Sequence, residues 1–123
     1  MISLVKDTID EKDIDRLVDW LKTYPRLTKG AVTLEFEEKF SNWLGRKHSV
    51  FVNSGSSANL LVLSALLQGK YLKNTKIVVP STAWSTDLAP VIQLGLKPLL
   101  CDSNLKDLSV DLEHLEKIFV EEF

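Results

Sequence analysis

The chain begins with the hydrophobic pattern of an amphipathic helix. Over about residues 10–22, apolar residues recur at intervals of three and four, so they share one face of a helix. Thr8 and Glu11 have the spacing of a capping box at its start, and Asp10 is a rival cap. The apolar face comprises Ile14, Leu17, Val18 and Leu21.

A second amphipathic helix is predicted over about residues 33–44. Its aromatic and leucine side chains share one face, whereas its glutamates lie mostly off that face. Gly45 follows the last apolar residue, and helices commonly end on a glycine in the left-handed conformation. The apolar face comprises Phe36, Phe40, Trp43 and Leu44.

Short apolar runs alternate with helical segments from Ser49 onward. Such alternation indicates a parallel sheet whose faces are covered by helices. We therefore expect an α/β fold of three layers with at least three parallel strands, whose ends at Val52, Val79 and Cys101 lie on one edge of the sheet. The predicted strands span residues 49–52, 76–79 and 98–101, and the predicted helices span about residues 56–67, 84–94 and 111–121.

Charge is concentrated toward the two ends of the chain. Residues 49–96 contain only four charged side chains, namely Lys70, Lys73, Lys76 and Asp87, which fits a sheet core with amphipathic flanks. The length of 123 residues suits one domain. The formal net charge of −2 means that the chain has no overall excess of positive charge, which proteins that bind nucleic acid usually have.

No leader, membrane span or disulfide is expected. The N-terminus lacks the basic segment and apolar run of a secretory signal. Polar side chains interrupt the uncharged stretch of residues 49–69, whereas a spanning helix needs about 20 predominantly apolar residues. Cys101 is the only cysteine, which excludes an internal disulfide and fits a cytoplasmic protein.

The loop before the third predicted helix has the features of an anion site. Gly55 allows tight backbone geometry, and the N–H groups of Ser56, Ser57 and Ala58 point off the helix start, where the helix dipole favours an anion. The loop follows a predicted strand, as ligand sites of open parallel sheets do. The alternative is an ordinary helix cap, with Ser54 or Ser56 as the capping residue.

A second loop follows the next predicted strand and contains Trp84. An aromatic ring at this edge of the sheet can stack on a flat ligand. The alternative is that Trp84 packs into the core at the start of a helix.

The remaining polar candidates predict no metal site. His48 and His114 have no second histidine, cysteine or carboxylate at metal-ligand spacing, so we interpret both as structural or solvated. Asp102 follows the third predicted strand, where a cap or turn role is expected.

Taken in order, these segments resemble the opening part of the DegT/DnrJ/EryC1/StrS family. Its members are pyridoxal-phosphate-dependent enzymes that act on nucleotide-linked keto-sugars. The resemblance extends over nearly all of the chain and is closest to the 3-dehydrase branch in two places, the loop at residues 53–60 and the segment at residues 90–98. The five segments that carry it are Phe36–Gly45, Asn53–Leu60, Ile77–Ser81, Pro90–Asp102 and Leu108–Glu116.

The resemblance implies a fold and a set of site residues. The chain would be a single partial domain from the large domain of fold-type I pyridoxal-phosphate enzymes, with N-terminal helices in residues 1–46 and a cofactor-binding α/β part in residues 47–123. The serines of the first loop would hold the phosphate of pyridoxal 5'-phosphate, the glycine would permit its approach, and the tryptophan would stack on its ring. The implied cofactor-binding residues are Gly55, Ser56, Ser57 and Trp84, and the implied substrate-binding residues are Thr28 and Gly30.

The residues that follow this segment in the family bear on the expected activity. Family members have a later aspartate beside the pyridine nitrogen, and further on a Schiff-base lysine or, in the dehydrase branch, a histidine. None of Lys70, Lys73 and Lys76 matches that lysine. We therefore expect the chain, taken alone, to be an inactive, truncated N-terminal part of a nucleotide-sugar aminotransferase or 3-dehydrase, with the choice between the two reactions open.

The resemblance also implies partners. Family members are homodimers with the cofactor at the interface, so we expect this chain to form a homo-oligomer, namely a dimer. We also expect a nucleotide-linked sugar as the substrate of the full-length protein. The alternative is a non-catalytic module that binds an anion or dimerises. A small α/β domain without a ligand explains the alternation of elements but not the two ordered loops.

Overall fold

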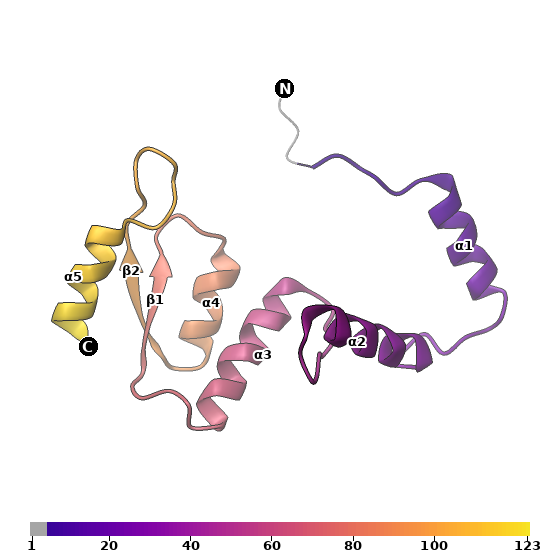
Figure 1. The fold of residues 1–123 in the computed structure, drawn as a ribbon, viewed down its shortest axis with the longest axis horizontal. Coiled ribbons are helices and arrows are strands. Elements are labelled where there is room, and N and C mark those ends of the chain that lie inside the picture. Colours follow the sequence, from indigo (N-terminus) through magenta and orange to yellow (C-terminus); the bar gives the residue numbers. More distant parts are fainter. Residues whose placement is uncertain (1–4) are drawn as a thin grey trace. The chain divides into compact units, whose positions relative to one another are not determined.

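The computed structural model describes residues 5–123, which form two compact units (Figure 1). One unit ends at Phe51 and the other spans Val52–Phe123. The five predicted helices are confirmed, each within two residues of its predicted bounds. The first unit contains α1 (Glu11–Leu21) and α2 (Ala31–Leu44), and the second contains α3 (Gly55–Gln68), β1 (Lys76–Pro80), α4 (Ser85–Gln93), β2 (Lys97–Cys101) and α5 (Leu112–Glu122).

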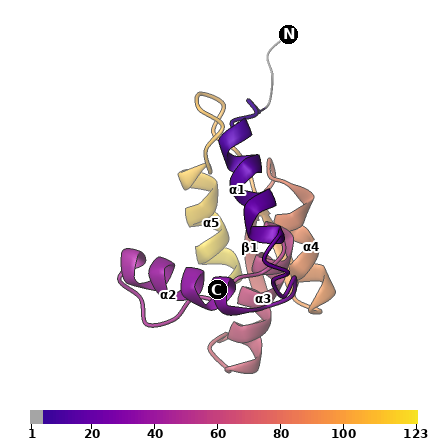
Figure 2. The same cartoon turned by 90° about the vertical axis from the view of Figure 1, so that its right-hand side faces the viewer.

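The second unit is built on a parallel pair of strands. β1 pairs with β2 in a register that places Val78 opposite Leu99 and Pro80 opposite Cys101. α4 connects the two strands and packs against both, and α5 packs against β2. Figure 1 shows both strands between α4 and α5, and Figure 2 shows β1 between them, so the predicted three-layer α/β arrangement is confirmed.

The core of this unit lies between the sheet and α4. Val79 of β1, Val91 of α4 and Leu96 are buried together, and Val91 is only 1% exposed. Gly95 has a φ of 70°, a left-handed conformation that ends α4 and lets the chain turn directly into β2. The apolar residues packed around the three are Leu63, Leu72, Ile77, Leu88 and Leu94.

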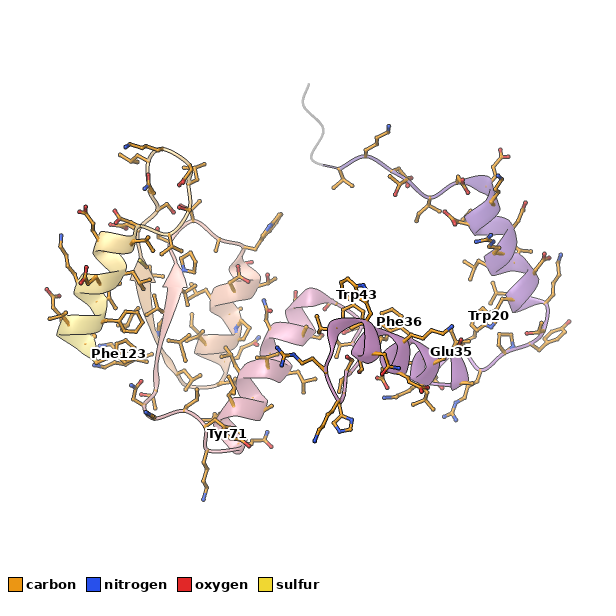
Figure 3. All side chains as sticks on the ribbon, viewed as in Figure 1. Trp20, Glu35, Phe36, Trp43, Tyr71 and Phe123 are labelled. Carbon is orange, nitrogen blue, oxygen red and sulfur yellow. The ribbon has the colours of Figure 1, made fainter. Side chains whose placement is uncertain are left out.

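The C-terminal end of α5 is fixed to the amino end of the sheet. Lys76, the first residue of β1, places its Nζ 2.9 Å from Oε2 of Glu122, and the Nζ of Lys97 lies 3.5 Å from the same oxygen. Lys76 also donates to the Glu122 carbonyl and lies 5.8 Å from the ring centre of Phe123, which is labelled in Figure 3. These lysines therefore satisfy the negative end of α5.

The predicted strand at residues 49–52 is wrong. The Phe51 N–H donates to the Glu37 carboxylate at 2.8 Å, and the Ser41 Oγ hydrogen-bonds to the Ser49 Oγ at 2.8 Å. The segment thus takes its partners from α2 instead of from a strand, and the sheet of the described residues has two strands. The shared edge is therefore confirmed for the ends of β1 and β2 but not for Val52.

An aromatic row on α2 reinforces this packing. The ring centres of Phe36 and Phe51 are 5.5 Å apart in an edge-to-face arrangement, and those of Phe36 and Phe40 are 5.7 Å apart and stacked. Phe40 continues the row to Trp43 at 5.6 Å. Phe36 and Trp43 are labelled in Figure 3. The apolar face predicted for this helix therefore binds the segment that the sequence assigned to the sheet.

The helix ends agree with the sequence in one case and differ in another. Gly45 ends α2 in the left-handed conformation with a φ of 68°, as predicted. At the start of α1, the capping box is made by Asp10 and Asp13, so the rival cap Asp10 is confirmed and the pair of Thr8 and Glu11 is wrong. Over residues 5–123, no helix is long and apolar enough to cross a bilayer.

The stability of the first unit is predicted to depend on the charge of Glu37. The Phe51 N–H and then the Lys29 ammonium, 2.9 Å away, lower the pKa of this carboxyl below its ordinary value. A lowered folded-state pKa stabilises the fold above the unfolded-state pKa, and this stabilisation is lost as the pH falls through the lower value. Urea unfolding between about pH 6 and pH 3 should therefore show a smaller loss of stability in Glu37→Gln than in the native chain.

The matched control for this prediction is Glu38→Gln. It removes the neighbouring carboxylate of α2, which makes none of these contacts. If both variants keep the pH dependence of the native chain, Glu37 does not hold this segment through its charge.

Candidate functional site

The start of α3 is capped by a serine that leaves other donors available. The Ser54 Oγ accepts from the Ser57 N–H at 3.2 Å, and Ser54 is therefore the capping residue. The same Oγ donates to the Ser57 Oγ at 3.2 Å, which leaves the Ser57 hydroxyl proton to point elsewhere. The N–H groups of Gly55 and Ser56 lie in the first turn, where an α-helix offers them no backbone acceptor.

Gly55 keeps this helix start open. Its backbone is ordinary right-handed helix, so the conformation at this position does not itself require a glycine. A Cβ atom built at Gly55 would meet no other atom within 4 Å. The missing side chain therefore leaves open space beside the free donors, and a ligand can approach the backbone there.

Asn59 joins the start of α3 to the start of α4. Its Nδ2 donates to the Thr86 carbonyl at 3.2 Å and to Oδ1 of Asp87 at 3.0 Å. Asn59 lies one turn after Gly55, and α4 begins at Ser85, so the two loops that the sequence singled out are held together. Asn59 and Asp87 line a hollow of about 280 Å³ formed by α3, α4 and β1.

Trp84 lies immediately before α4 with its side chain in solvent. It is 73% exposed, so the alternative of core packing is wrong. Its carbonyl accepts from the Asp87 N–H at 2.9 Å, which places Trp84 in the first turn that Asn59 also contacts. The indole ring is thus available to a ligand at the carboxyl end of β1.

The residues that sequence reasoning missed are the two members of this tie. Asn59 belongs to the motif at residues 53–60, but the sequence predicted no role for it. Asp87 was noted only as one of the four charged residues within residues 49–96. The available signal was that Asp87 is the sole acidic residue within residues 49–96. Its partner lies 28 positions away, a pairing that no local pattern predicts.

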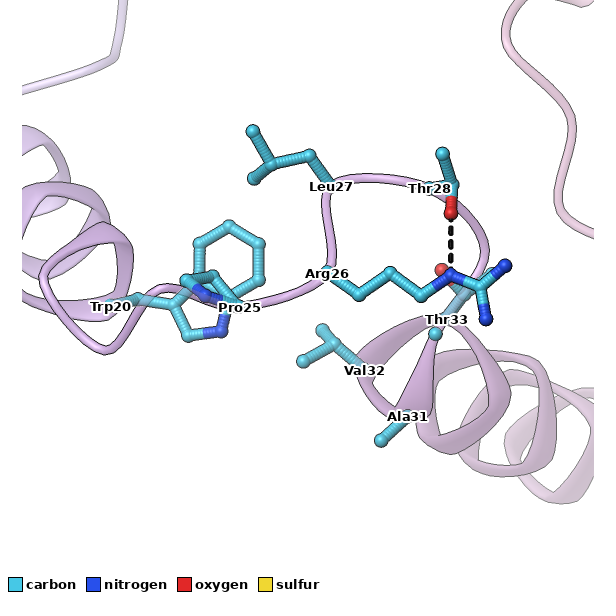
Figure 4. Close-up of a pocket in the computed structure, with 9 residues that line it drawn as sticks. Trp20, Pro25, Arg26, Leu27, Thr28, Ala31, Val32 and Thr33 are labelled. Atoms are coloured by element: carbon cyan, nitrogen blue, oxygen red, sulfur yellow. Dashed lines mark hydrogen bonds between the residues drawn. The ribbon is translucent and has the colours of Figure 1, made fainter.

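The first unit holds the two residues implied to lie near a substrate. Thr28 accepts a hydrogen bond from the Arg26 Nε at 2.7 Å, and Gly30 precedes α2 without any side-chain cap (Figure 4). Both residues line a hollow of about 470 Å³ between the end of α1 and the start of α2. The structure therefore brings Thr28 and Gly30 together within one hollow.

The remaining polar candidates have structural contacts. The His114 Nδ1 lies 3.1 Å from the Asp102 nitrogen and 3.2 Å from its Oδ2, so this pair fixes α5 to the end of β2. The Asp102 carbonyl accepts from the Asp111 N–H, consistent with the turn role expected for Asp102. Burial raises the pKa of the Cys101 thiol. Within the described part of the chain, no cluster of three His, Cys, Asp or Glu side chains can hold a metal.

Comparison with known proteins identifies close similarity to one family. The model of the DegT/DnrJ/EryC1/StrS aminotransferase family matches residues 7–122. A GDP-4-keto-6-deoxy-D-mannose 3-dehydratase of Yersinia pseudotuberculosis is 35% identical over 96% of this chain. A UDP-4-amino-4-deoxy-L-arabinose–oxoglutarate aminotransferase of Shewanella sediminis is 28% identical over 98% of it.

Solved structures agree with this assignment. The Escherichia coli GDP-4-keto-6-deoxy-D-mannose-3-dehydratase with bound hydrated pyridoxal phosphate has a TM-score of 0.80, with 32% identity over 93% of this chain. A variant GDP-4-keto-6-deoxymannose-3-dehydratase with bound GDP-perosamine also has a TM-score of 0.80. The chain spans only about 30% of the length of these relatives. The expected family and its fold-type I architecture are thus confirmed for this segment.

The tie between the two loops is predicted to stabilise the second unit. Asn59→Ala removes both hydrogen bonds and should lower the free energy of unfolding by about 1–3 kcal/mol. Asp87→Asn keeps an acceptor oxygen for the Asn59 amide and is the matched control, with a smaller expected loss. Urea unfolding followed by circular dichroism measures both. Equal losses in the two variants would show that the hydrogen bond does not join the loops.

Proposed function

Because the chain belongs to the DegT/DnrJ/EryC1/StrS aminotransferase family, we propose that it is the N-terminal part of a pyridoxal-phosphate-dependent enzyme acting on a nucleotide-linked keto-sugar. Among the relatives that match at least 90% of this chain, GDP-sugar 3-dehydratases are 35% and 32% identical and an aminotransferase is 28% identical, whereas a transaminase at 37% identity matches only 68% of it. The longer matches favour dehydration over transamination. The single cysteine, Cys101, is compatible with a cytoplasmic location.

The open start of α3 is the observation that carries this proposal. Gly55 and Ser56 present backbone N–H groups, and the hydroxyls of Ser56 and Ser57 add donors beside them. The helix dipole adds positive potential at the same place, so a phosphate group fits this donor set. The missing Cβ at Gly55 gives the phosphate room to reach the backbone.

Trp84 supplies the second part of the proposed cofactor site. Its exposed ring follows β1, and the Asn59 tie holds the first turn of α4 near the start of α3. When bound, pyridoxal phosphate supplies an electron-accepting ring that stabilises negative charge on a substrate carbon. Trp84 would orient that ring by stacking and would shield one of its faces from water.

The three lysines between α3 and β1, namely Lys70, Lys73 and Lys76, have no proposed catalytic role. Lys70 and Lys73 follow the far end of α3, whose 14 residues separate its two ends by roughly 20 Å at 1.5 Å per residue. Lys76 begins β1 at the amino edge of the sheet and is paired with Glu122. Their placement supports the expectation that the chain alone does not carry the Schiff-base residue.

We further propose that Thr28 and Gly30 contact the substrate. The Thr28 hydroxyl accepts from Arg26, so its own proton is available to a sugar oxygen. Gly30 leaves the start of α2 without a side-chain cap, so the backbone there is accessible. Both residues line the hollow shown in Figure 4.

Self-association of the chain is also part of the proposal. The apolar face of α1 is 41–50% exposed at Ile14, Leu17, Val18 and Leu21. Among the described residues, β1 pairs with a strand on one side only. Exposed apolar faces and open strand edges promote association between chains, and the second copy is the occupant we propose.

Pyridoxal phosphate should quench tryptophan fluorescence when titrated into the chain. Gly55→Val should abolish this binding, because the valine would fill the space beside the donors without meeting a protein atom. Ser56→Ala should only weaken it, since the backbone donors remain, and Trp84→Leu should remove most of the quenching. Saturable quenching that is unchanged in both Gly55→Val and Trp84→Leu would place the cofactor elsewhere.

Association between copies should be visible by light scattering. The apparent mass of the native chain should rise with concentration, and Leu17→Glu should lower it by placing a charge in the apolar face of α1. Lys12→Glu changes a charge on the opposite face of the same helix and is the matched control. A monomeric mass at every concentration, or equal effects of the two variants, would contradict the proposed dimer.

A further inference from the structure

The hollow between α1 and α2 has the size and lining of a small-molecule site. Its volume of about 470 Å³ falls within the range of about 300–1,000 Å³ that is usual for ligand pockets. It lies wholly within the first unit, and its walls combine an indole, a guanidinium and a helix start. The lining residues that matter here are Trp20, Pro25, Arg26, Thr28, Gly30 and Thr33.

Arg26 gives the hollow a positive charge with a fixed direction. Its Nε donates to the Thr28 Oγ1 at 2.7 Å, which leaves the two terminal nitrogens of the guanidinium for other acceptors. None of the ion pairs among residues 5–123 involves Arg26, and no acidic residue lines the hollow. A guanidinium in this state is suited to phosphate oxygens, which it can bind in a bidentate manner.

Trp20 provides a flat apolar surface in the same hollow. Figure 4 shows its indole beside Pro25, with the Arg26 side chain extending from the loop toward Thr28 and Thr33. An aromatic ring of this kind stacks on nucleobases irrespective of their identity. The hollow thus offers separate groups for a base and for phosphates, in a lining without negative charge.

We propose that this hollow binds the nucleoside diphosphate part of the nucleotide-linked substrate, with Arg26 on the phosphates and Trp20 against the base. This inference rests on the proposed function, which supplies the substrate class, and it adds two residues that the family resemblance did not mark. The uncapped start of α2 at Gly30 adds a favourable potential for the phosphates. The proposed cofactor site at Gly55–Ser57 is in the other unit, so the two sites can be tested separately.

The test uses the full chain with Trp43→Phe and Trp84→Phe, which leave Trp20 as the only tryptophan. GDP should quench its fluorescence saturably. In the same background, Arg26→Ala should raise the Kd by about tenfold or more, the effect expected for loss of a charged hydrogen bond. Arg26→Lys should fall between the two, because a lysine keeps the charge without the bidentate geometry. Arg46→Ala, with helical content matched by circular dichroism, is the control and should not change the Kd.

Two further ligands separate the roles of the two residues. By calorimetry on the otherwise native chain, Arg26→Ala should weaken pyrophosphate but not guanosine, whereas Trp20→Leu should weaken guanosine but not pyrophosphate. The absence of saturable GDP quenching, or a Kd for GDP that is the same in Arg26→Ala and the parent, overturns the proposal.

The same variants distinguish this proposal from the proposed cofactor site. Arg26→Ala in a chain that retains Trp84 should bind pyridoxal phosphate as the native chain does. If GDP binding depends on Arg26 while Gly55→Val leaves pyridoxal phosphate binding intact, the nucleotide site in the hollow is supported and the cofactor assignment fails. If Gly55→Val abolishes pyridoxal phosphate binding while Arg26→Ala leaves the Kd for GDP unchanged, the cofactor assignment is supported and the hollow does not bind the nucleotide.

Discussion

The side-chain amide of Asn59 joins two helix starts that the parallel strands alone would leave independent. In a parallel pair, the residues after β1 and the residues before α4 form one connection, while α3 reaches the same region from an earlier part of the chain. The two hydrogen bonds from Asn59 to Thr86 and Asp87 bring these segments together. Every interpretation of Gly55, Ser56, Ser57 and Trp84 as one site depends on this contact.

The two edges of the sheet have different chemistry. The amino edge carries Lys76 and Lys97, whose charges are used by Glu122 and the end of α5. The carboxyl edge carries the exposed indole of Trp84 before α4, and the hydrogen bonds of Asn59 bring the neutral donors at the start of α3 to the same region. The lysines therefore anchor a helix at one edge, while backbone N–H groups and hydroxyls are the donors available to the proposed anion at the other.

An amphipathic face, which is a local property of the sequence, predicted α1 and α2, and the alternation of apolar runs with helical segments predicted α3, α4 and α5. The apolar runs also predicted β1 and β2, which pair in parallel across the connection that contains α4. The run at residues 49–52 has the same composition, yet a strand needs a partner, and here Glu37 and Ser41 of α2 supply the hydrogen bonds instead. Local pattern cannot distinguish these outcomes, because it does not show which element supplies the hydrogen-bond partners of the segment. The proposed phosphate-binding role of Ser56 and Ser57 follows from their position at a helix start, whereas Asn59 and Asp87 come together only through the fold.

The capped but open first turn of α3 has a consequence for the thermodynamics of binding. The Ser54 hydroxyl fixes the turn through Ser57, and the helix fixes the directions of the remaining N–H groups before any ligand arrives. Donors that are already preorganised lose little conformational entropy when an anion binds, so less of the interaction energy is spent on ordering the protein. Such a cradle favours rapid capture with little rearrangement of the backbone, and its affinity is limited by the number of donors and not by the cost of assembling them.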